Sequence, residues 1–186
     1  MDNINAEFQR LRAGQKLDRS LWRKFHCACC RDIWSYIKDN RSRAAVESAE
    51  HFIHGQGTEA ELEGSYIKAD SVVKKSWEIV ESLRLNRVPD EWIWPVSADC
   101  DDAWVRYSAA SAAATCALNI DNDILFTRLP DAAASVRPWA FARLDVESHG
   151  IIDSDADYRQ KVLDRFEILF KEEDRRFSGI LHSLVS

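Results

Sequence analysis

The chain has 186 residues, of which 46% are hydrophobic and 30% charged, and its formal net charge is -6 at neutral pH. A chain of this length buries enough apolar surface to fold as one domain without disulfides or a metal. Its acidic balance excludes general binding of nucleic acid, which depends on a basic surface. No apolar run approaches the roughly 18 residues of a membrane-spanning helix. We therefore expect no nucleic-acid partner and no membrane partner.

The five cysteines also indicate a cellular compartment. They are odd in number and three of them are crowded together: Cys27, Cys29, Cys30, Cys100 and Cys116. This pattern is typical of reduced thiols, and the first residues lack the basic and apolar segments of a secretory signal. We expect a cytoplasmic protein, with an oligomeric state that the sequence leaves open.

The hydrophobic pattern has a period of 3.6 residues, and six Gly and four Pro leave long stretches uninterrupted. It predicts an all-α protein, a single domain over residues 1–186 built as a compact bundle of about six to seven helices. In the first half of the chain we expect a short helix over 5–13, a helix from Asp18 whose apolar stripe continues to Ile37, a helix from Asn40 to Gly55 or Gly57, and one from Thr58 to Leu85. In the second half we expect helices over 99–118, from Asp131 to Ser148 and from Ser154 to Leu184. Pro138 either interrupts the helix from Asp131 or is the first residue of a new helix.

Local signals support several of these helices. Thr58 and Glu61 have the spacing of a capping box, in which each side chain bonds the other's backbone N–H. Gly64 weakens the first turns of the helix that this box opens, by about 1 kcal/mol relative to alanine. Small residues over 109–114 predict a central, tightly packed helix. Between Pro89 and Pro95, Trp92 and Trp94 predict a loop that either anchors a partner or covers one end of the bundle.

The segment His26-Cys27-Ala28-Cys29-Cys30 combines imidazole and thiol groups, which suit zinc or another soft metal. On a helix only His26 with Cys29 or Cys30 share a face, and this gives fewer ligands than a structural site needs. A buried cysteine also behaves as a small hydrophobic residue. The sequence therefore leaves core packing, metal binding through His26, Cys29 and Cys30, and thiol redox chemistry open.

Glu47 with His51, and Glu50 with His54, are i,i+4 pairs on one helix face, which can hold local hydrogen bonds or ion pairs. Acidic clusters occur at the start of one helix and within the last, where they either form solvated surface or steer a basic partner: Asp99, Asp101 and Asp102, then Glu172, Glu173 and Asp174.

The run Phe25-His-Cys-Ala-Cys-Cys-Arg31, the stretch over 41–50, Gly55 and Glu61-Leu62 resemble uncharacterised bacterial helical proteins that carry a Phe-Ala-Cys-Ala-Cys-Cys-Arg-Arg-Ile-Trp motif. His26 stands where that motif has alanine. The order of elements is also similar to the DUF416 (YjaG-like) family: Trp77, the Val88-Pro89-Asp90 loop, Ala103-Trp104 and a long last helix with Glu172 and Glu173. Both resemblances imply a helical fold and imply no activity.

The chain contains no phosphate-binding glycine loop, no nucleophile elbow and no His-Glu-x-x-His zinc motif. We therefore expect no catalytic residues, no cofactor and a non-enzymatic protein-interaction module with a basic partner, such as an immunity or antitoxin protein. Its candidate contacts are Trp92, Trp94, Asp99, Asp101, Asp102, Glu172, Glu173 and Asp174. The alternative is a metal-binding or thiol-redox protein that uses the cluster from His26 to Cys30.

Overall fold

The structure is a computed structural model that describes residues 19–85, 98–118, 130–148 and 155–185. Every element in these ranges is helical, which confirms the all-α prediction: α2 (Arg19–Asp32), the 3-10 helix η1 (Trp34–Tyr36), α3 (Asn40–Ile53), α4 (Glu59–Leu85), α5 (Ala98–Ala117), α6 (Pro130–Ala134), α7 (Val136–Ser148) and α8 (Asp155–Val185). Of these helices, none has both the length and the apolar character to cross a membrane. The short helix expected over 5–13 lies outside the described residues.

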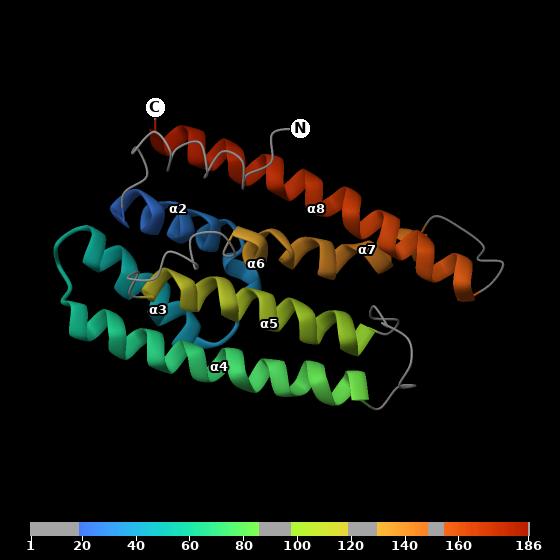
Figure 1. Ribbon diagram of the computed structural model, residues 1–186, viewed down its shortest axis with the longest axis horizontal. Coiled ribbons are helices and arrows are strands. Elements are labelled where there is room, and N and C mark those ends of the chain that lie inside the picture. Colours follow the sequence, from blue (N-terminus) through green and yellow to red (C-terminus); the bar gives the residue numbers. More distant parts are fainter. Residues whose placement is uncertain (1–18, 86–97, 119–129, 149–154, 186) are drawn as a thin grey trace.

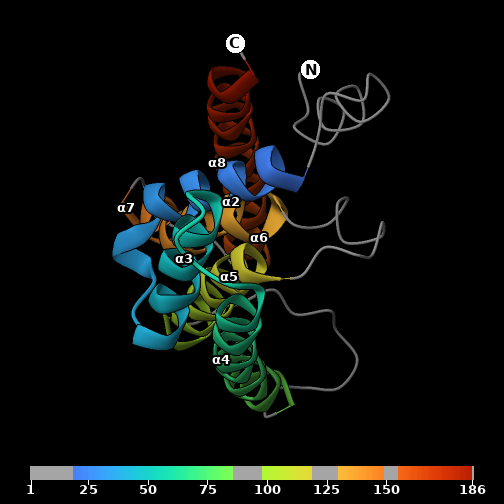
Figure 2. The same cartoon turned by 90° about the vertical axis from the view of Figure 1, so that its left-hand side faces the viewer.

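The long helices lie side by side as two antiparallel pairs, α4 with α5 and α7 with α8 (Figure 1). Helices α2 and α3 cover one end of the molecule, and Figure 2, which faces that end, shows α2 between α3 and α8. Helix α5 contacts α2, α3, α4, α6 and α7, and it therefore lies at the centre of the bundle.

The predicted central helix is confirmed, because α5 is buried along most of its length. Its inward side chains are almost all small: Ala109, Ala110, Ala112, Ala113, Ala114, Cys116 and Ala117 are each at most 5% exposed. Side chains of this size allow five neighbouring helices to approach one axis closely. The large core residues come from the surrounding helices instead, namely Trp22, Phe25, Ile33, Ile37, Phe177 and Leu181.

Helix α2 is shorter than its apolar stripe predicts. The helix ends at Asp32, and the chain turns through Ile33 (φ -98°, ψ 18°) into η1. Ile33 and Ile37 stay buried, so the apolar positions are right although the helix does not continue through them. The turn is stabilised from α3, where the Arg43 guanidinium donates a 2.6 Å hydrogen bond to the Ile37 carbonyl.

The turn between α3 and α4 follows two predicted signals. Gly55 adopts a positive φ of 71° after the C-cap His54. Backbone bonds from Gly55 to Phe52 and from Gln56 to His51 then complete a Schellman motif. The capping box is confirmed, because Thr58 N–H donates to Glu61 at 2.8 Å and Glu61 N–H donates to the Thr58 hydroxyl at 3.2 Å.

Pro138 neither interrupts nor starts a helix, which corrects the prediction for this region. The break falls at Ser135, between α6 and α7, and Pro138 occupies the first turn of α7. A proline is tolerated there because the N–H groups of a first turn have no partner within the helix.

A group of four charged side chains joins α7 to α2 and α8. Arg137 pairs with Asp32 at 3.0 Å and with Glu173 at 2.8 Å, and Arg176 contacts the same two carboxylates. The Arg137 side chain is 20% exposed and that of Glu173 is 11% exposed. Burial raises the pKa of Glu173 and outweighs the opposing effect of Arg137. The carboxylates therefore depend on their guanidinium partners.

We expect Arg137→Met to lower the free energy of unfolding by about 2–4 kcal/mol, because it leaves two largely buried carboxylates with one cation. Denaturant unfolding followed by far-UV circular dichroism measures this change. Arg106→Met is the matched control, since Arg106 pairs with Asp102 at 2.6 Å through side chains that are 61% and 58% exposed. It should change stability by less than about 0.5 kcal/mol. Equal effects of the two variants would contradict the structural importance of Arg137.

Candidate functional site

The cysteines of α2 form a thiol cluster with Cys116 of α5, a partner that the sequence spacing does not reveal. The sulfur atoms of Cys30 and Cys116 lie 3.4 Å apart, and Cys27 lies close enough to raise the pKa of Cys116. All three side chains are at most 4% exposed. Burial is the main cause that raises the pKa of Cys116 well above its usual value, and it does the same for Cys29. These two groups are therefore protonated thiols at neutral pH.

Arg23 connects this cluster to the end of α5. Its guanidinium donates to the carbonyl oxygens of Cys116 at 3.2 Å and Leu118 at 3.3 Å. It also lies over the Phe52 ring, 4.8 Å from the ring centre. Arg23 is only 6% exposed, and desolvation lowers its pKa from the usual value. A buried cation therefore satisfies the carbonyl groups that α5 leaves unpaired at its C-terminus.

His26 lies in an apolar environment. Its ring is 4.1 Å from that of Trp22 and 5.3 Å from that of Phe25, measured between centroids. Desolvation lowers the pKa of His26 to about 3, and its Nε2 atom has no hydrogen-bond partner among the described residues. The ring is therefore neutral at physiological pH.

The structure does not assemble the alternative metal site. Within the four described ranges, no three His, Cys, Asp or Glu side chains are arranged to hold a metal ion. His26, Cys29 and Cys30 are each buried, and each packs into the core cluster or against its aromatic rings. The geometry thus corresponds to the core-packing interpretation of these residues.

The acidic residues proposed as partner contacts do not form one surface. Asp99 and Asp102 are exposed at the start of α5, whereas Asp101 is 8% exposed. On α8, Glu172 is exposed, Asp174 is half-buried and Glu173 is paired with Arg137 and Arg176. Figure 1 shows that the start of α5 and the C-terminal half of α8 lie toward opposite ends of the molecule. Trp92 and Trp94 lie outside the described residues.

A denser group of acids occurs where α3 meets α4. Residues 44–67 contain five glutamates and no lysine or arginine; we name this segment the acidic hairpin. Glu47, Glu59, Glu61 and Glu63 are exposed, and Glu50 is paired with Arg31. Sequence reasoning noted Glu47 and Glu50 beside His51 and His54, but it did not connect them with the glutamates in the first turns of α4, a helix that packs against α3.

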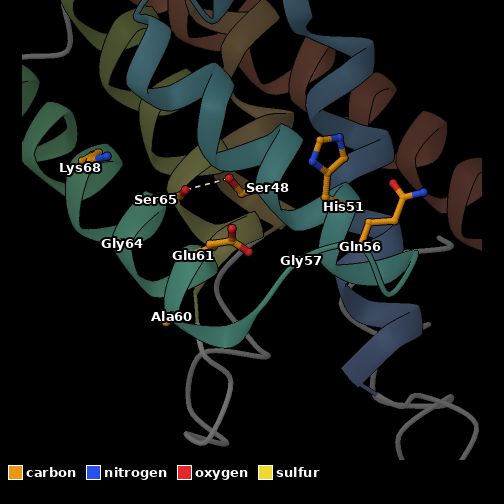
Figure 3. A pocket seen from close by; sticks show the side chains of 9 residues that line it. All are labelled: Ser48, His51, Gln56, Gly57, Ala60, Glu61, Gly64, Ser65 and Lys68. Carbon is orange, nitrogen blue, oxygen red and sulfur yellow. Dashed lines mark hydrogen bonds between the residues drawn. The ribbon is translucent and has the colours of Figure 1, made fainter.

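The acidic hairpin also borders a polar pocket of about 440 Å³ (Figure 3). One wall is a face of α4 that carries Glu61, Gly64, Ser65 and Lys68 at helical spacing, with Ala60 beside them. The opposite wall is Ser48 and His51 of α3, and Gln56 and Gly57 of the turn close one end. The hydroxyl groups of Ser48 and Ser65 are 2.7 Å apart and hold the two walls together.

Gly64 lies in the wall of this pocket. A Cβ atom at this position would meet no atom within 4 Å, so the packing of the protein itself does not require a glycine. A glycine inside a helix nevertheless costs about 1 kcal/mol relative to alanine. What the missing side chain provides is space between α3 and α4.

A second, smaller pocket of about 270 Å³ lies on the other side of the same turn. Its lining includes the apolar side chains of Phe52, Ile53 and Leu62. The carboxylates of Glu59 and Glu63 and the guanidinium groups of Arg19 and Arg23 also line it. The acidic hairpin therefore borders two pockets, one lined mainly by polar residues and one with an apolar base.

Comparisons with protein-family models, with curated proteins and with solved structures found no match to this chain.

The buried His26 predicts a dependence of stability on pH. Its pKa is about 3 in the folded chain and about 6.5 in the unfolded chain, so only the unfolded chain binds this proton between these values. The free energy of unfolding should fall as the pH falls through this window, by about 1.4 kcal/mol per pH unit from this group. We expect His26→Phe to remove that part of the slope in urea titrations between pH 6 and pH 4.

His51→Gln is the control for this measurement, because His51 is exposed on α3. It should leave the slope unchanged. Wild type and His26→Phe with the same slope would contradict the assignment of a neutral buried imidazole.

Gly64→Ala tests the role of the glycine in the pocket. The variant should raise the free energy of unfolding by about 0.5–1 kcal/mol, because alanine is the better helix former and its Cβ meets nothing. Thermal unfolding measures the change. Gly179→Ala in α8 is the matched control, since a Cβ there also meets nothing within 4 Å. A loss of stability in Gly64→Ala alone would show that the pocket is more closely filled than the structure indicates.

Proposed function

We propose that this protein is a non-enzymatic protein-interaction module that binds a basic partner through the acidic hairpin. The observation that carries the proposal is the coincidence of four exposed glutamates, a segment without lysine or arginine, and a polar pocket between α3 and α4. The proposed contact surface differs from the exposed acids that the sequence favoured, which are Asp99 and Asp102 on α5 and Glu172 on α8.

The charge pattern suits capture of a cationic surface. Exposed carboxylates concentrated on one feature attract a basic partner over a distance of about one Debye length and raise the association rate. A neutralised basic toxin, bound by an immunity or antitoxin protein, is one partner of this kind. Specificity then has to come from shape, which the two pockets beside the turn provide.

The polar pocket suits a long basic side chain. Glu61 is already oriented, because the backbone N–H and the hydroxyl of Thr58 hold one of its carboxylate oxygens. An arginine or lysine that enters between α3 and α4 would meet this carboxylate and the hydroxyl groups of Ser48 and Ser65. Lys68 lies two helical turns from Glu61, about 10 Å along the axis, and offers a donor to an acceptor on the same partner.

The chemistry of the core supports a non-enzymatic function. The groups with the greatest catalytic potential in the described core are His26, Cys29 and Cys116. Burial keeps the imidazole neutral and the two thiols protonated. A general base needs a pKa near the working pH, and a nucleophilic cysteine needs a stabilised thiolate. Burial shifts the pKa values of these groups away from both conditions.

The proposal is tested with the partner that wild-type protein captures from lysate of the native host, identified by mass spectrometry and then purified. We expect Glu47→Lys/Glu63→Lys to weaken its binding at least about tenfold at low salt in isothermal titration calorimetry, mainly through slower association. Both glutamates are exposed, so the fold should persist in the variant. The wild-type affinity should also fall as the salt concentration rises.

The control variant is Glu78→Lys/Glu172→Lys, which changes the net charge by the same amount at exposed sites on α4 and α8. It should retain most of the affinity. If the control variant lost more affinity than Glu47→Lys/Glu63→Lys, the contact surface would lie elsewhere. Equal losses of affinity would mean that binding depends on net charge and not on the acidic hairpin. A partner that is not basic would refute the proposal.

A further inference from the structure

We infer that Cys30 and Cys116 form an oxidation site, a buried dithiol that hydroperoxides convert to an intramolecular disulfide between α2 and α5. The inference is independent of the acidic hairpin, which lies on different elements. It starts from the 3.4 Å separation of the two sulfur atoms, compared with about 2.05 Å in a disulfide. Closing this gap requires the two sulfur atoms to approach by a little more than 1 Å.

Three features favour this pair over the other cysteines. Cys30 and Cys116 are at most 1% exposed, so a disulfide between them is shielded from bulky reductants. They come from different helices in direct contact, so the bond would not distort a single helix as a pairing within residues 27–30 would. The Cys116 sulfur contacts the Cys30 sulfur and the Ala112 carbonyl oxygen, whereas Cys29 is buried among other core side chains.

The reaction balances with hydrogen peroxide as the oxidant. One of the two thiols loses its proton, and its sulfur attacks a peroxide oxygen, which breaks the O–O bond and gives a sulfenic acid and one water. The second thiol then displaces the hydroxyl group of the sulfenic acid, which leaves with a proton as a second water, and the S–S bond forms. The protein loses two hydrogen atoms and two electrons, and the peroxide is reduced to two molecules of water.

Burial controls the rate of this reaction. The thiolate is the reacting form, and desolvation raises the pKa of Cys116 well above its usual value. Oxidation should therefore be slow at pH 7 and faster at pH 9. Cys27 lies near Cys116 as well, and it offers a third thiol that can exchange with the first-formed disulfide.

The experiment treats the folded full-length protein with hydrogen peroxide, quenches it with acid and maps the disulfides by mass spectrometry after tryptic digestion. The expected product joins the peptide 25–31, which contains Cys27, Cys29 and Cys30, to the peptide 107–128, which contains Cys116. Cys29→Ala should retain this product, and Cys30→Ala should lower its yield at least about tenfold at equal time. Oxidised protein should melt at a higher temperature than reduced protein, because the bond closes a long loop.

Two results would overturn the inference. The first is that folded wild-type protein forms sulfinic acid, or disulfides between other cysteines, before the link between peptides 25–31 and 107–128 appears. The second is a link that persists undiminished in Cys30→Ala, which would assign the site to Cys27. Far-UV circular dichroism of each variant establishes that it is folded, and Cys30→Ser serves as a second variant if Cys30→Ala unfolds. The same oxidation in guanidinium chloride should lose its selectivity, since the two helices no longer hold the sulfur atoms together.

Discussion

The burial of α5 on several sides at once is the constraint on which the rest of the structure depends. Five helices contact it, and only small side chains allow them to approach so closely. A helix end inside such a bundle leaves carbonyl groups without water. Arg23 of α2 supplies the missing donors at the C-terminus of α5, and this fixes how α2 crosses α5. The position of the thiol cluster follows from that crossing.

The same packing decides which residues are available for function. His26 and Cys29 of α2 are buried in the core, where desolvation suppresses their charged forms. Glu173 is committed to the charged group that ties α7 to α2 and α8. His26, the cysteines of α2 and Glu173, which the sequence singles out as candidate site residues, therefore pack in the core or connect helices. The carboxylates of the acidic hairpin, in contrast, stay exposed beside a pocket.

Local signals predicted the elements well, and contacts between elements explain where the predictions fail. Thr58 and Glu61 form the expected capping box, because both partners lie within one turn. The end of α2 at Asp32 could not be predicted, since Ile33 and Ile37 continue the helical spacing while Arg43 of α3 holds the turn. The sequence analysis placed the candidate acidic contacts on α5 and α8 and did not group the glutamates of the acidic hairpin, because that grouping depends on how α3 folds back on α4.

The sequence by itself determined the helical class, the central alanine-rich helix and the capped turn between α3 and α4, because each depends on periodicity, side-chain size or hydrogen bonds between near neighbours. Only the tertiary structure decided that Cys116 faces Cys30, that Glu173 is paired and that Gly64 opens onto a pocket. These outcomes depend on the relative placement of helices that are distant in the chain. That placement arises from the summed packing of many side chains, which no local pattern encodes.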